Sequence, residues 1–220
     1  LAEIICGYCL ALDLSTASAI TSGQFASAHE RLGRNRPVEW FTDKDLTPSF
    51  FTAGVQKGLD DTDVQVEDVT LIDMEMGSSI ITELTSQRVK KLVGLFPYRL
   101  HLKDGKSAMN ELDVLVKIKP SDDEVIMMVN GMARMCDAKL ASAHEKNKER
   151  LGFGGCHIRE LAIYEQKDPR FVRYTPKVYK TIRNDEREAF VVVMEKLENL
   201  ELMNTANDTR GWTGEHIKAA

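Results

Sequence analysis

The chain has 220 residues, of which 43% are hydrophobic, so it has enough apolar material for one large domain or two small ones with a proper core. Its formal net charge of -5 argues against nucleic acid or an anionic membrane surface as a partner and favours a small molecule or another protein. We find no uninterrupted apolar run of about 18 residues and no basic leader with a cleavage site, which predicts a cytoplasmic protein without membrane contact.

The amino-terminal residues predict two helices, over residues 2–13 and 15–32, because small and apolar residues recur at helical spacing. A serine and a threonine at the start of the second segment can cap it. Cys6 and Cys9 form a CxxC motif in the first segment. No second CxxC or pair of histidines completes four zinc ligands, and the neighbours are apolar. We therefore favour buried helix cysteines over a metal or redox pair.

The polar stretch 33–37 ends in a proline and predicts a boundary between a helical tail, 1–37, and a second unit, 45–220. Thr47 can cap a helix that has Pro48 in its first turn and ends near Gly58. From Val64 onward the period becomes strand-like. We expect five strands, over residues 64–72, 80–92, 112–118, 177–182 and 189–194.

Helical patterns lie between and after these strands, over residues 122–150, 156–166 and 213–220. This order predicts an α+β fold in which helices pack on a five-stranded antiparallel sheet. The helix 122–150 carries an apolar stripe rich in methionine, which we interpret as core, although it could also mediate self-association. Its members are Val125, Met128, Met132, Met135 and Leu140.

A lysine lies inside the apolar strand 112–118, where its charge costs desolvation free energy unless it is paired. Lys117 and Lys119 share a face under strict alternation, and either can be the inward one. We favour Lys117 because it has apolar flanks on both sides. Glu160, on the helix 156–166, can point toward the sheet and pair with that lysine.

Two further features suit a nucleotide site, which needs a flexible turn over the phosphates and backbone groups beside the base. Gly77, Ser78 and Ser79 separate two predicted strands and could cover phosphate, although a plain hairpin turn explains them equally well. The apolar strand 189–194 ends abruptly in a charged segment. That pattern fits a hinge between two lobes, and it also fits any core strand that leaves the protein interior.

Three phrases at these separations resemble the amino-terminal lobe of the aminoglycoside-phosphotransferase and choline-kinase family. They are RELAIY at 159–164, VVMEKL at 192–197 and GWTGEHI at 211–217, and they follow Val116-Lys117. The resemblance implies a protein-kinase-like lobe over residues 45–220 that binds ATP with magnesium.

Within that family resemblance, each candidate residue has an implied role. Lys117 would hold the α- and β-phosphates and pair with Glu160. Met194 would line the adenine pocket, and the backbone of Glu195 and Leu197 would hydrogen-bond the adenine. The residues Gly77, Ser78 and Ser79 would cover the phosphates.

The family also needs a catalytic aspartate in a His-Gly-Asp-like loop and a magnesium-binding aspartate, and these follow the helix that begins near Thr213. The sequence contains neither, so the resemblance implies a nucleotide-binding half without its catalytic lobe. We expect this half to bind nucleotide weakly at best and not to transfer phosphate.

A second resemblance covers about residues 1–37. The phrases LAEII at 1–5, LALDLS at 10–15 and AHERLGR at 28–34 are similar to the carboxy-terminal end of 3-hydroxy-3-methylglutaryl-CoA reductase (HMG-CoA reductase). The family's usual Glu-Leu-Ser is Asp13-Leu14-Ser15 here. The resemblance implies that His29 matches the histidine that protonates the departing coenzyme A thiolate, with NADPH as the cofactor.

Three functions follow as hypotheses. The first is a fragment of an ATP-dependent phosphotransferase for a small hydroxylated metabolite, fused to the reductase. The second is a non-catalytic kinase-like interaction or regulatory module. The third is a fragment of the NADPH-dependent reductase. A paired Lys117 in a cleft favours the first hypothesis over the second, because an interaction module does not need that pair.

Overall fold

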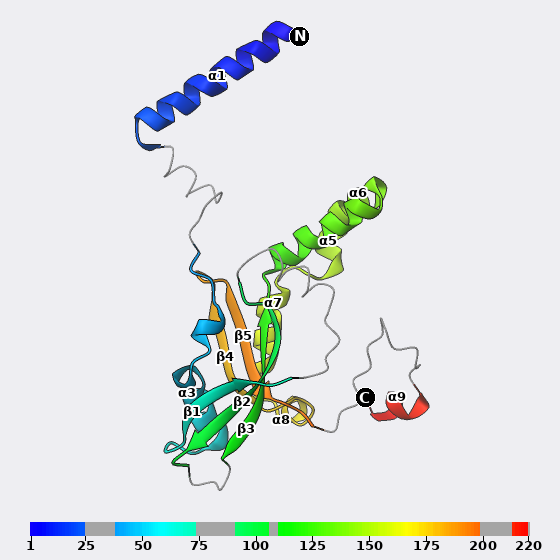
Figure 1. Ribbon diagram of the computed structural model, residues 1–220. Coiled ribbons are helices and arrows are strands. Elements are labelled where there is room, and N and C mark those ends of the chain that lie inside the picture. The colour runs from blue at the N-terminus through cyan, green and yellow to red at the C-terminus, as the bar shows by residue number, and fades with distance from the viewer. Residues whose placement is uncertain (25–37, 74–90, 106–109, 199–212, 220) are drawn as a thin grey trace. The chain divides into compact units, whose positions relative to one another are not determined.

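The structure is a computed structural model that describes residues 1–24, 38–73, 91–105, 110–198 and 213–219 (Figure 1). By its internal packing the chain divides into two units, Leu1–Glu39 and Trp40–Ala220.

In the described part of the first unit, residues 1–24, one helix, α1 (Ala2–Thr21), runs through the predicted boundary between residues 13 and 15. The predicted cap does not form, because the Thr16 hydroxyl donates back to the carbonyl of Leu12 at 2.8 Å and the helix continues. The prediction of buried cysteines is also wrong, since α1 has no buried residue and Cys6 and Cys9 are exposed.

By length and composition alone, α1 is long and apolar enough to cross a membrane. Counting uninterrupted apolar residues missed this, because Glu3 and Asp13 divide the run while the helix spans both. The core helix of a soluble domain and a signal sequence near an amino terminus pass the same test. The cytoplasmic location therefore stays a prediction.

The second unit is built on the predicted five-stranded antiparallel sheet, in the order β1-β2-β3-β5-β4. Its strands are β1 (Gln65–Leu71), β2 (Gly94–Lys103), β3 (Glu111–Lys119), β4 (Val178–Asn184) and β5 (Ala189–Glu195). The second strand was misplaced in sequence. Most of the predicted segment 80–92 lies outside the described residues, its last two residues are not in a strand, and β2 begins at Gly94.

The helices differ from the sequence patterns at two points: α8 (Pro169–Val172) was not predicted, and the predicted helix 122–150 is divided. Asp137 adopts an extended conformation, and its side chain caps a new helix by accepting from the N–H of Lys139 at 2.7 Å, so the predicted helix 122–150 is broken. The helices of this unit are α3 (Pro48–Leu59), α5 (Asp122–Cys136), α6 (Ala138–Asn147), α7 (Cys156–Tyr164), α8 (Pro169–Val172) and α9 (Gly214–Ala219), with short 3-10 turns at Asp43–Asp45 and Lys148–Leu151.

The methionine-rich stripe is buried only in its first part. Val125 and Met128 are buried, whereas Met135 and Leu140 are exposed. The interpretation of the whole stripe as core is therefore half correct.

One face of the sheet carries the larger core. Phe51 and Val55 of α3 pack there against the inward side chains of the strands. The helix approaches β4 closely at Gly58, where an added Cβ would lie 2.3 Å from Cδ1 of Tyr179. The core residues from the strands include Val66, Leu100, Val114, Val116, Ile118, Val191 and Val193.

The opposite face is covered by α7, which packs on β4 and β5. Leu161 of α7 contacts a second, smaller cluster formed by Phe190, Val192 and Met194 of β5, with Leu115 of β3 packed against it. We call this side of the sheet the α7 face. The candidate site lies on it.

Candidate functional site

Strand alternation places both candidate lysines on the α7 face. In β3, Val116 and Ile118 point into the larger core, so Leu115, Lys117 and Lys119 point to the other side. The strand register agrees, because Lys117 lies opposite Val192 and Lys119 opposite Phe190. The two charged residues therefore border an apolar cluster.

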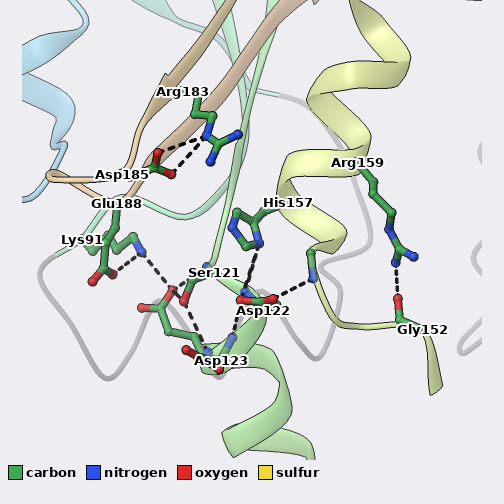
Figure 2. Close-up of polar contacts among 12 residues, drawn as sticks. Lys91, Ser121, Asp122, Asp123, Gly152, His157, Arg159, Arg183, Asp185 and Glu188 are labelled. Carbon is green, nitrogen blue, oxygen red and sulfur yellow. Dashed lines mark hydrogen bonds and ion pairs between the residues drawn. The ribbon is translucent and has the colours of Figure 1, made fainter. Parts of the chain in front are cut away.

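A polar contact at the start of α5 holds the start of α7 (Figure 2). The carboxylate of Asp122 accepts from the N–H of Gly155 at 2.6 Å, and the Asp122 N–H donates to Nδ1 of His157 at 3.1 Å. Gly155 is the residue before α7 and has φ = 65°, a conformation that glycine adopts without steric cost. We call these three residues the α7 clasp.

The His157 ring is buried and lies against Phe190, with 4.2 Å between ring centroids. Because Nδ1 accepts a hydrogen bond, the neutral ring carries its proton on Nε2. Burial holds the pKa of His157 below its ordinary value, and the charge of Asp122 opposes that shift. The clasp therefore uses the neutral form of the ring.

Glu160 lies one turn after His157 and is the point where α7 meets the two lysines. Its Oε1 is 2.5 Å from Nζ of Lys117, and its Oε2 is paired with Nζ of Lys119. Only 18% of the Glu160 side chain is exposed, against 31% for Lys117 and 21% for Lys119. The pairing that the sequence predicts is present, with both lysines as partners.

This triad carries a surplus of positive charge. Burial alone would raise the pKa of Glu160, but hydrogen bonds from Lys117 and Lys119 hold it below its ordinary value. Glu160 is therefore ionised at neutral pH and balances one of the two ammonium groups. The remaining charge suits an anionic ligand such as phosphate.

The end of β5 lies on the same face. Met194 is buried and pairs with Leu115 in the strand register. Glu195 belongs to the ladder, because its N–H donates to the carbonyl of Lys177 at 2.8 Å. The backbone of Leu197 makes no hydrogen bond to another described residue, and its side chain is 44% exposed.

An ion-pair network fixes the residue that follows β5. The Lys196 N–H donates to the carbonyl of Asp113 at 3.2 Å, and the Asp113 carboxylate accepts two hydrogen bonds from Arg99, at 2.8 and 3.0 Å. The hydrogen bond from Arg99 holds the pKa of Asp113 below its ordinary value. The chain beyond β5 is thus tied to the start of β3.

Of the predicted site residues, the structure pairs Lys117 with Glu160 on the α7 face and places Met194 in the neighbouring cluster, whereas Glu195 lies opposite Val114 of the larger core. Sequence reasoning missed the α7 clasp and the Arg99–Asp113 pair. The predicted site residues Gly77, Ser78, Ser79 and His29 lie outside the described residues. Their proposed roles stay predictions.

Two other features bear on ligand binding. Among the described residues no group of three or more His, Cys, Asp or Glu side chains could hold a metal ion. A hollow of about 490 Å³ lies between α5 and α6 and is lined by Arg134, Ala141 and Glu145, among others. None of its lining residues belongs to β3, β5 or α7, so it is separate from the lysine–glutamate site.

Comparison of the chain with protein-family models, curated proteins and solved structures finds no match.

Proposed function

We propose that residues 40–220 form a nucleotide-binding lobe of an ATP-dependent phosphotransferase that acts on a small hydroxylated metabolite. The observation that carries this proposal is the pairing of Lys117 with Glu160 across β3 and α7, in a partly buried site. This pair places the Lys117 ammonium group on the α7 face, where its N–H groups can donate to phosphate.

The end of β5 supports the adenine part of the proposal. Met194 and Leu115 provide an apolar surface beside Lys117 on the α7 face. The backbone of Leu197, which has no hydrogen bond to another described residue, is available to a base edge. Triphosphate and base would then lie along one face of the sheet, with magnesium carried on the phosphates.

Isothermal titration of Mg-ATP into the chain tests this proposal. We expect saturable binding that is lost in Lys117→Ala, because that variant removes the cation that Glu160 orients. Lys103→Ala is the matched control, since Lys103 lies on the neighbouring strand and its side chain is 57% exposed. Equal binding by wild type and Lys117→Ala, or no binding by either, would overturn the proposal and favour a non-catalytic interaction module.

A further inference from the structure

The two lysines that share Glu160 occupy different surroundings. Lys117 lies opposite Leu95 of β2, which is 40% exposed, so it borders the open part of the α7 face. Lys119 ends β3, has no partner residue on β2, and is followed directly by Pro120 and the cap of α5. Lys119 is also the less exposed of the two.

Lys119 lies close to residues at both ends of α7. His157 and Tyr164, at the two ends of α7, both experience the charge of Lys119. Both aromatic residues lie in or beside the cluster between α7 and β5. With 21% of its side chain exposed, Lys119 is therefore more covered than Lys117, which is 31% exposed and more open to a ligand.

We propose that Lys119 is the anchor of Glu160, and that Lys117 is the exchangeable cation that turns from Glu160 to an anionic ligand. With one carboxylate oxygen held by Lys119, Glu160 stays paired when Lys117 moves, so no buried carboxylate is left without a partner. Without Lys119, both oxygens of Glu160 would compete with the ligand for Lys117. Lys119 is a positioning residue that acts through Glu160.

The different roles of Lys117 and Lys119 do not depend on which anion binds. That this anion is a triphosphate rests on the proposed function. Amine acylation followed by mass spectrometry measures the difference between the two lysines directly, with Lys103 as the internal reference. We expect Lys117 to react several times faster than Lys119, because an anchored ammonium group gives up its proton and its partner less readily. Equal rates, or faster reaction of Lys119, would overturn the inference.

Variants of the anchor give the second measurement. In Lys119→Gln we expect slower acylation of Lys117, because Glu160 then pairs with Lys117 alone. Lys119→Arg should restore the wild-type rate, since a guanidinium can hold the same carboxylate oxygen. An unchanged Lys117 rate in Lys119→Gln, in a variant whose Lys103 rate and thermal unfolding match the wild type, would contradict the anchor role.

Ligand binding separates this inference from the proposed function. Mg-ATP should protect Lys117 from acylation and leave Lys119 unprotected. Lys119→Gln should weaken Mg-ATP binding by about tenfold, which is the effect expected from removing one positive charge roughly 7 Å from the phosphates in a half-exposed site. Adenosine binding should not change. If the wild type binds no Mg-ATP, the proposed function fails, while the acylation rates still decide the anchor role.

Discussion

The two faces of strand β3 differ in what they bury. Val114, Val116 and Ile118 are almost completely buried on one face and make only apolar contacts in the larger core. On the other face, the same strand carries Lys117 and Lys119, which are paired and partly exposed. Alternate residues of β3 thus belong to the apolar core on one face and to a charged cluster on the other.

The comparison indicates where stability and function lie. An apolar face lowers the free energy of the folded state in proportion to the area it buries. A partly buried ion pair adds little stability, because desolvation offsets its attraction. The two lysines beside the apolar cluster therefore contribute little to stability, in keeping with the proposed role in binding an anion.

The largest expected effect is on the apolar face. Phe51 is 1% exposed and packs between α3 and the sheet, so Phe51→Ala should lower the free energy of unfolding by about 3–5 kcal/mol. Denaturant unfolding measures this change. Leu71→Ala, at a strand position that is 60% exposed, should change it by less than about 0.5 kcal/mol. Similar losses in the two variants would contradict the described core.

Glu160→Ala should have the next largest effect, because it leaves two ammonium groups close together without their carboxylate. We expect a loss of about 1–3 kcal/mol in the free energy of unfolding, together with loss of nucleotide binding. Glu145→Ala is the control, since Glu145 also pairs with a lysine but is 54% exposed. Its loss should be clearly smaller, because solvent screens an exposed ion pair. Equal losses would mean that Glu160 is an ordinary surface acid.

Gly155→Ala should cost about 1 kcal/mol, because φ = 65° at Gly155 is strained for a residue with a Cβ atom. Gly154→Ala is the matched control. Gly154 has no positive φ, and no atom lies within 4 Å of a Cβ added there. The difference between the two variants in thermal unfolding measures the backbone strain at the clasp, and a larger loss in Gly154→Ala would contradict the described turn.

The periodicity of strands and helices predicted much of the α7 face. Alternation placed Lys117 and Lys119 on one side of β3, and helical spacing turned Glu160 toward the sheet. These predictions succeeded because each depends on residues close together in sequence. The strands β4 and β5 were predicted for the same reason.

The sequence could not show β2 or the clasp. Proline argues against an internal strand, yet Pro97 lies within β2. Its carbonyl accepts from Ile72 at the end of the β1 ladder, so its missing N–H faces that side and removes no bond to β3. The clasp joins residues more than 30 positions apart, Asp122 with Gly155 and His157, and no local pattern indicates such a contact.

The smallest expected effect is a pH dependence that originates at the clasp. Burial keeps the pKa of His157 below its ordinary value of 6.5, so between pH 6.5 and that lower pKa the unfolded chain binds a proton that the folded protein does not. Stability should therefore fall as the pH decreases from 6.5, above the acidic range in which Glu160 and Asp122 contribute, since the folded state holds their pKa values below the ordinary 4.5 and 3.8. Thermal unfolding between pH 7 and pH 5 measures the slope. His157→Gln, which cannot take up a proton, should flatten it, and a slope that survives in this variant would assign the effect to another group.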